Sequence, residues 1–196
     1  DPLFAWDCYR RFVEGYGTVV LGVPAESFGT TPGGEATPHS LESLVHLHQK
    51  TILRVTGRAF PQAPVVQLWG AIRAVFGSWQ SARARAYRGL HGISDDGGTA
   101  VTVQAMVFGN RDARSASGVA HSRDPITGAA GMSGEYLPQA QGEELVSGRR
   151  TPLPLAGPGE TLETSMPQAF RALRRAAARL EAHSGRMQEI EFTIER

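Results

Sequence analysis

The chain has 196 residues, which is about the length of one ordinary domain and enough for a sizeable hydrophobic core. Hydrophobic residues make up 41% of it and charged residues 20%, values that exclude a disordered tail, and no apolar run approaches the ~20 residues of a membrane-spanning helix. Twenty basic residues against nineteen acidic ones give a net charge of +1, so no bulk field attracts the chain to nucleic acid or to a membrane.

Cysteine usage and the opening residues bear on the cellular compartment. Cys8 is the only cysteine, so the chain has no partner for an internal disulfide, which fits a reducing compartment. The opening segment 1–12 lacks the layout of a signal peptide. We therefore expect a cytoplasmic protein.

Apolar residues at helical spacing predict a first helix that opens at Asp1-Pro2 and ends near Gly15 and Gly17. A short apolar run, TVVLGV, follows it at 18–23. The stretch 24–40 is rich in proline, glycine, serine and threonine, which predicts a mobile loop.

Two further helices are expected before residue 95. Ser40 is the predicted cap of the second, whose apolar residues recur at helical spacing until Gly57. The third begins at Pro64, and the segment ARARAYRGL at 82–90 either continues it or packs beside it.

After residue 98 the pattern changes from helices to strands. Alternating apolar residues predict strands in three segments, a Pro/Gly-rich link precedes a helix that starts near Pro167, and the last ten residues form a closing strand. The three earlier strands are TAVTVQAMVF at 99–108, SGVAHSRDP at 117–125 and MSGEYL at 132–137. Helices followed by a sheet-based half predict an α+β fold.

The last strand is the most informative segment. With a period of two, its apolar residues share one face, while Glu189, Glu191 and Thr193 share the other. The two carboxylates then lie about 7 Å apart along the backbone. Such a pair suits Mg²⁺, which prefers one or two carboxylates together with phosphate oxygens. The alternative is a half-buried strand whose solvent face is acidic.

Other segments can be interpreted either as ligand-binding sites or as ordinary structural elements. The strand end Gln104-Ala105-Met106-Val107 offers backbone groups for an adenine edge and two apolar walls, or it is a core strand that ends in a Gly-Asn turn. Glu143 and Glu144 are loop acids that either serve a site or are merely solvated. Arginines at 171–179 are one turn apart and form either an anion patch or a solvated helix face. The six histidines have no metal-ligand spacing.

Six blocks of the sequence, in order, resemble the amino-terminal nucleotide-binding region of the pyruvate, phosphate dikinase family. They cover nearly the whole chain, with gaps only near 24–40 and 155–161. The blocks are DCYRRFVEGYGTVVLGV, QLWGAIRAVFGSW, GTAVTVQAMVFGN, GVAHSRDPITG, GEYLPQAQGEELVSGRRTP and MQEIEFTIE.

The resemblance implies part of an ATP-grasp fold. Residues 1–60 would form a helical subdomain and residues 61–196 a partial ATP-grasp domain with an antiparallel-rich sheet and packed helices. Within that domain, 61–104 would belong to a shared lobe and 105–196 to an acidic lobe.

The resemblance also implies a reaction. In that family ATP, with Mg²⁺, phosphorylates an enzyme histidine on a separate domain, inorganic phosphate is the co-substrate, and the phosphohistidine converts pyruvate to phosphoenolpyruvate, with AMP and pyrophosphate as products. The implied partners are ATP, phosphate, the phosphohistidine domain and a second copy in a homodimer, with no nucleic acid and no membrane. Because the family's first lobe, its histidine motif and its barrel have no counterpart here, we expect the chain to be a fragment that is inactive alone.

Site residues transfer position by position from the family's motifs, with some departures. Glutamate stands at 144 and 189 where the family has aspartate, Ala116-Ser117-Gly118 replaces a Gly-Thr-Gly, and His121 replaces a phenylalanine. The residues implied are Arg10, Glu143 and Glu144 for catalysis, Gln104, Ala105, Met106 and Val107 for adenine, and Glu189 and Glu191 for metal. These departures leave open a non-catalytic ATP-grasp-derived binding module. A phosphoenolpyruvate synthase-like enzyme is the other alternative, although MVFGN and GEYL…AQGE resemble the dikinase family more closely.

Overall fold

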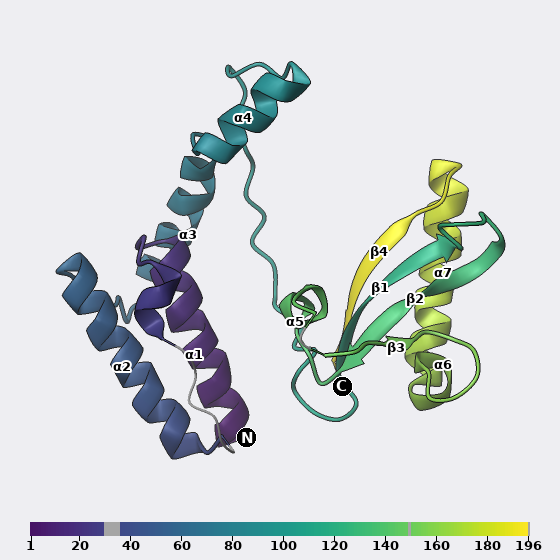
Figure 1. Ribbon diagram of the computed structural model, residues 1–196, viewed down its shortest axis with the longest axis horizontal. Coiled ribbons are helices and arrows are strands. Elements are labelled where there is room, and N and C mark those ends of the chain that lie inside the picture. Colours follow the sequence, from purple (N-terminus) through teal and green to yellow (C-terminus); the bar gives the residue numbers. More distant parts are fainter. Residues whose placement is uncertain (30–35, 149, 196) are drawn as a thin grey trace. The chain divides into compact units, whose positions relative to one another are not determined.

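The computed structural model describes residues 1–29, 36–148 and 150–195, which form two compact units, Asp1–Val103 and Gln104–Arg196 (Figure 1). Residues 61–103 belong to the first of these units, and the boundary between the units lies between Val103 and Gln104. Within the described ranges, no helix is both long and apolar enough to cross a bilayer. Part of the loop expected to be mobile, residues 30–35, lies outside the described residues.

In the first unit, all regular secondary structure of the described residues, 1–29 and 36–103, is helical. Its helices are α1 (Pro2–Val19), the short 3-10 helix η1 (Ala25–Phe28), α2 (Pro38–Thr56), α3 (Pro64–Ser78) and α4 (Ala82–His91). Helices α3 and α4 are separate elements, because Ser81 caps α4 by accepting the backbone N–H of Ala84 at 3.2 Å.

The prediction that the first helix ends near Gly15 and Gly17 is wrong, since α1 runs on to Val19. Gly17 serves packing instead of termination. A Cβ built on it would lie 2.7 Å from Phe28 Cζ and 3.1 Å from Ile52 Cδ1, so only glycine lets η1 and α2 approach α1 this closely. Gly15 has no atom within 4 Å of a built Cβ.

The start of α2 also differs from the prediction. Thr37, and not Ser40, is the N-cap, and Ser40 is the third helical residue of a capping box. The Thr37 hydroxyl accepts the backbone N–H of Ser40 at 3.1 Å, and the Ser40 hydroxyl accepts that of Thr37 at 2.9 Å. The helix ends at Thr56, before Gly57 in the left-handed conformation, as predicted.

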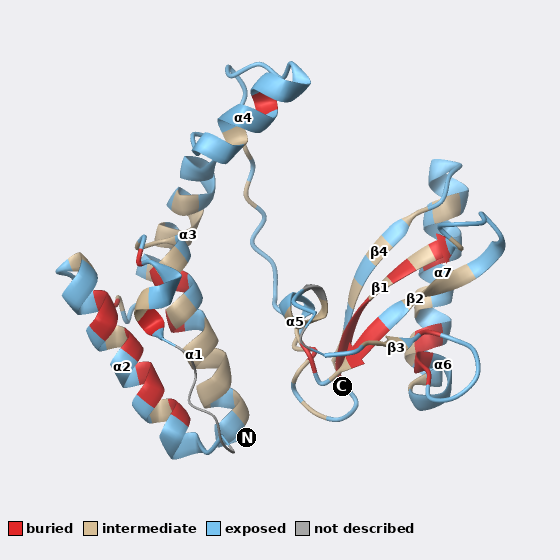
Figure 2. Ribbon diagram, in the orientation of Figure 1, coloured by how far each residue is buried: buried red, intermediate tan, exposed pale blue. Residues whose placement is uncertain are grey.

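The core of the first unit lies between α1, α2 and η1, and Figure 2 shows buried positions along both long helices. Phe60 lies edge-on to the rings of Tyr16 and Phe12, with ring centres 5.5 and 5.9 Å apart. By contrast, α3 has no buried residue, although its apolar residues follow helical spacing. Arg88 of α4 is buried, bound to the Asp95 carboxylate and stacked on the Trp79 ring.

In the second unit, the residues that the structure describes form a four-stranded antiparallel sheet and three helices. Its elements are β1 (Ala116–Arg123), β2 (Ala130–Pro138), α5 (Gly142–Val146), β3 (Leu153–Pro154), α6 (Leu162–Ser165), α7 (Pro167–Ser184) and β4 (Glu189–Ile194). The strand order is β3-β2-β1-β4, so the carboxyl-terminal strand lies beside β1. Helices plus this sheet confirm the α+β class.

Each face of this sheet has a distinct role. Ala116 and Ala120 of β1 point to the side of α7 and form a buried cluster with Phe170. Apolar residues of β4 pack against that cluster, whereas Glu189 and Glu191 point to the opposite, exposed face. The predicted alternation along the last strand is therefore confirmed.

The predicted strand at 99–108 is not formed. An alternating pattern can form a strand only where a neighbouring edge accepts its hydrogen bonds. The sheet that the structure describes has β3 and β4 at its edges, and neither pairs with this segment. Val103 and Met106 are accordingly each 65% exposed.

Alanine at two neighbouring glycines of α1 should have opposite effects. Gly15→Ala should raise the free energy of unfolding by about 0.5–1 kcal/mol. Alanine lowers the conformational entropy of the unfolded chain, and its Cβ at this helix-interior position would meet no atom within 4 Å. Gly17→Ala should lower it by about 1–3 kcal/mol through overpacking against Phe28 and Ile52. Urea denaturation followed by tryptophan fluorescence is the measurement, since all three tryptophans lie in the first unit. Equal effects of the two variants would contradict the close packing at Gly17.

Candidate functional site

A cleft of about 870 Å³ lies on the face of the second unit opposite α7. One wall is the irregular segment 104–107, the floor comes from β1 and β4, and the far wall is α5 with Gln141 before it. Its lining is partly apolar and partly polar, with Met106 and Val107 on one side and Glu143 and Glu191 among the polar groups.

The segment 104–107 is held in place where it meets the sheet. The backbone N–H of Phe108 donates to the Glu195 carboxylate at 2.8 Å, and Arg111 pairs with the same carboxylate. Gly109 follows, and its carbonyl accepts the Ala140 N–H at 2.9 Å. A Cβ on Gly109 would lie 2.3 Å from the carbonyl oxygen of Ala140, so glycine is required for this crossing.

The contacts at Glu195 change its ionisation. The hydrogen bond from the Phe108 backbone N–H, and after it the one from Arg111, lower the pKa of the Glu195 carboxyl. The wall of the cleft is thus tied to the end of β4 by a group that is charged at neutral pH.

On the cleft face, three side-chain pairs form a ladder between β1 and β4. The register sets Ser117 opposite Thr193, Val119 opposite Glu191, and His121 opposite Glu189. The hydroxyls of the first pair are 3.3 Å apart, and in the third pair the His121 Nε2 lies 3.9 Å from the Glu189 Oε2.

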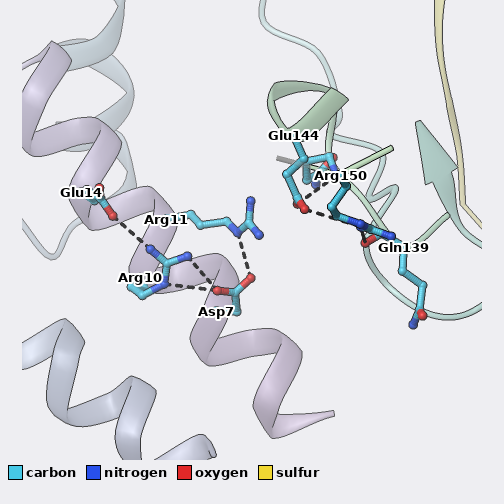
Figure 3. A network of polar contacts seen from close by, with 8 residues as sticks. Asp7, Arg10, Arg11, Glu14, Gln139, Glu144 and Arg150 are labelled. Atoms are coloured by element: carbon cyan, nitrogen blue, oxygen red, sulfur yellow. Dashed lines mark hydrogen bonds and ion pairs between the residues drawn. The ribbon is translucent and has the colours of Figure 1, made fainter. Parts of the chain in front are cut away.

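Helix α5 presents its two glutamates differently. Glu143 lines the cleft, whereas Glu144 completes a capping box by accepting the backbone N–H of Gln141 at 3.3 Å. Arg150 supports this connection, as Figure 3 shows. Its guanidinium donates to the carbonyls of Pro138 and Gln139 at 2.8 and 3.3 Å and lies 3.7 Å from the Glu144 carboxylate.

Arg10 belongs to the first unit and lies on α1. Its guanidinium pairs with Asp7 at 2.9 Å and with Glu14 at 3.0 Å, both on the same helix (Figure 3). Because two carboxylates already orient it, Arg10 is held in a defined direction on the helix surface.

The structure gathers most, though not all, of the sequence-predicted site residues. The segment 104–107, Glu143 and Glu191 line one cleft. Glu189 is the first residue of β4 and lies outside the cleft lining, and Glu144 is part of a helix cap. Sequence reasoning gave no site role to three residues of the cleft face, Ser117, Thr193 and His121, although it had placed Thr193 on one face with the two glutamates. Period-two alternation would place each on a face, but only the strand register shows which residues meet.

The two glutamates of β4 fit a hard cation in the chemistry of their donors. They are exposed, share one face, and supply carboxylate oxygens next to a cleft of nucleotide size. Among the described residues, no three His, Cys, Asp or Glu side chains gather into a metal cage. Such an ion would therefore need oxygens from water or a bound phosphate.

Taken together, the second unit is an α+β structure with a cleft that has an apolar wall and acidic side chains in its lining. The chain belongs to the family described as pyruvate phosphate dikinase, AMP/ATP-binding domain, whose model matches residues 40–165. The segment 104–107 and Glu143 fall inside that match, while Arg10, Glu189 and Glu191 fall outside it.

Curated relatives extend the similarity to the ends of the chain. The pyruvate, phosphate dikinase of Rhizobium meliloti (strain 1021) is 45% identical, over all of this chain and 24% of the relative. That of Clostridium symbiosum is 42% identical over all of this chain and 23% of the relative. The chloroplastic protein of Flaveria pringlei is 41% identical over 98% of this chain and 21% of the relative. The chain thus spans about a quarter of the length of the relatives it matches.

The lowered pKa of Glu195 predicts an acid-sensitive contribution to stability. A depressed folded-state pKa means that the carboxylate stabilises the fold fully above its unfolded pKa of about 4.3, and that this stabilisation is lost as the pH falls through the folded-state pKa. The difference in the free energy of unfolding between the natural chain and Glu195→Gln should therefore be constant near neutral pH and shrink below about pH 4.3.

Urea denaturation followed by circular dichroism across this pH range is the measurement. Glu163→Gln is the matched control, because Glu163 is an exposed glutamate of α6 outside this contact. A Glu195 difference that stays constant from neutral to acid pH would show that the ion pair and the Phe108 hydrogen bond do not hold the segment.

Proposed function

We propose that this chain is the ATP-binding part of a pyruvate, phosphate dikinase, which transfers a phosphoryl group from ATP to an enzyme histidine. The overall reaction would convert ATP, phosphate and pyruvate to AMP, pyrophosphate and phosphoenolpyruvate. The observation that carries the proposal is one cleft lined by both the segment 104–107 and Glu191. Membership in an AMP/ATP-binding family and relatives named pyruvate, phosphate dikinase support it.

The apolar wall of the cleft is the proposed adenine site. Met106 and Val107 are 65% and 45% exposed, so their side chains are available to cover a flat ring. Backbone N–H and C=O groups of 104–107 lie outside the described sheet ladder and can recognise the base edge. The anchor at Phe108 and Gly109 fixes the direction of this wall.

The acidic floor is the proposed phosphate end. Glu191 and Glu189 would hold Mg²⁺, which supplies charge neutralisation for the phosphates when it is bound. Glu143 would orient the ligand from α5, and Glu144 would keep that helix in place through its cap. The catalytic role that the resemblance implies for Arg10 is also part of the proposal, and the guanidinium of Arg10 is paired with Asp7 and Glu14 on α1.

The finer features expected from the resemblance are part of the same proposal. They are an ATP-grasp architecture, with 1–60 as a helical subdomain and 61–196 as a partial nucleotide-binding domain, and a phosphohistidine domain as partner. The proposal also includes a homodimeric assembly and a cytoplasmic location. We also propose that the chain alone is inactive, because phosphoryl transfer needs cations and an acceptor histidine positioned around the phosphates.

Glu191→Gln should nearly abolish histidine phosphorylation by ATP in a polypeptide that joins this chain to the remaining length found in its relatives. Loss of the metal-binding charge should lower the rate by about a hundredfold or more. Glu135→Gln is a matched control, because Glu135 lies on the same face, opposite the same Val119, but on β2 and outside the cleft lining. The measurement is incorporation of label from ATP into the protein, and a normal rate for Glu191→Gln would exclude Glu191 from the site.

Product analysis of the same polypeptide separates the proposed reaction from its alternatives. AMP, pyrophosphate and phosphoenolpyruvate that form only with added phosphate would support the dikinase. AMP with free phosphate in place of pyrophosphate would favour a phosphoenolpyruvate synthase-like enzyme. Nucleotide binding without turnover would favour a non-catalytic binding module.

A further inference from the structure

His121 and Glu189 form a cross-strand pair at the outer end of the cleft face. The register places them directly opposite each other, with the His121 Nε2 at 3.9 Å from the Glu189 Oε2. The neighbouring pair is hydrogen-bonded, because the Ser122 backbone N–H donates to the Gln188 carbonyl at 2.9 Å. His121 and Glu189 are therefore a non-hydrogen-bonded pair, the type in which facing side chains lie closest.

We propose that His121 and Glu189 bind a first-row transition ion of the cobalt, nickel and zinc group. An imidazole nitrogen beside a carboxylate oxygen is a mixed donor set, and imidazole favours these ions over magnesium, which prefers oxygen alone. The proposal shares Glu189 with the proposed magnesium site, but it requires neither nucleotide nor the first unit, because both ligands lie on adjacent strands.

The observed geometry needs only a small adjustment to hold an ion. Two ligand atoms at about 2.1 Å from one ion and at a right angle are about 3 Å apart. The present separation is 3.9 Å. The Glu189 side chain is 65% exposed and free of core packing, so it can turn toward the ring, whereas the His121 side chain, at 23% exposed, keeps its direction.

The rest of the coordination shell would come from solvent. Because no third His, Cys, Asp or Glu joins the pair among the described residues, two protein ligands would leave the other positions to water. Such an open shell predicts modest affinity, and it leaves room for an oxygen of a phosphorylated ligand. Binding of the metal alone is therefore the direct readout.

The test is calorimetric titration of the 196-residue chain with cobalt chloride in the absence of nucleotide. His121→Phe keeps a ring of similar size, and Glu189→Gln keeps the side-chain shape, yet each removes one ligand. Each should weaken cobalt binding by about tenfold or more. His39→Phe and Glu135→Gln, an exposed histidine on α2 and a glutamate on the same sheet face, should leave the affinity unchanged.

A second measurement removes dependence on how well the variants fold. In the natural chain, paramagnetic Co²⁺ should shift or broaden the NMR signals of the His121 ring before those of His39. Absence of cobalt binding, or binding that His121→Phe does not weaken, would overturn the proposal and leave the pair as an ion pair only. Because no nucleotide is present, either result is independent of whether the cleft binds ATP.

Discussion

The antiparallel register of β1 against its neighbours is the constraint on which the second unit depends. It places the small alanines of β1 under α7 and directs Glu189 and Glu191 to the opposite face. Since side chains alternate, a slip of one residue would bury these carboxylates in the core, at a large desolvation cost. Gly118 enforces the register, because a Cβ there would lie 2.5 Å from the Glu135 carbonyl oxygen and from the Phe192 ring.

The cleft exists because a second, polar constraint acts on that sheet. The segment 104–107 is not a strand, so no ladder of backbone hydrogen bonds positions it. The end of the segment is instead positioned by the Glu195 carboxylate, which accepts the Phe108 backbone N–H and forms an ion pair with Arg111. A wall held at its end and open along its length leaves backbone groups and apolar side chains available to a ligand, which a fifth paired strand would have covered.

Local sequence patterns predicted much of the fold, because helix starts and side-chain alternation depend on residues that are neighbours in the chain. The alternation of β4, the predicted strands at 117–125 and 132–137 and the proline-started helix at Pro167 all agree with the structure. The predictions failed where the local structure depends on a residue or strand that is distant in the sequence. Gly15 and Gly17 suggested a helix end, but Gly17 accommodates Phe28 from another element. The segment 99–108 alternates like a strand, yet no described edge pairs with it.

By itself, the sequence determined the α+β class and the two faces of the last strand, because both depend on periodicity. The acidic and apolar residues proposed for a nucleotide site came from residue type together with the resemblance to a family. Only the tertiary structure decided which of them share a cleft. It joined Glu191 to Met106, retained Glu144 in a helix cap, and set His121 beside Glu189. Glu191 and Met106, like His121 and Glu189, are far apart in the chain, so no local pattern shows that they lie together. For His121 and Glu189 it is the strand register that brings them within reach.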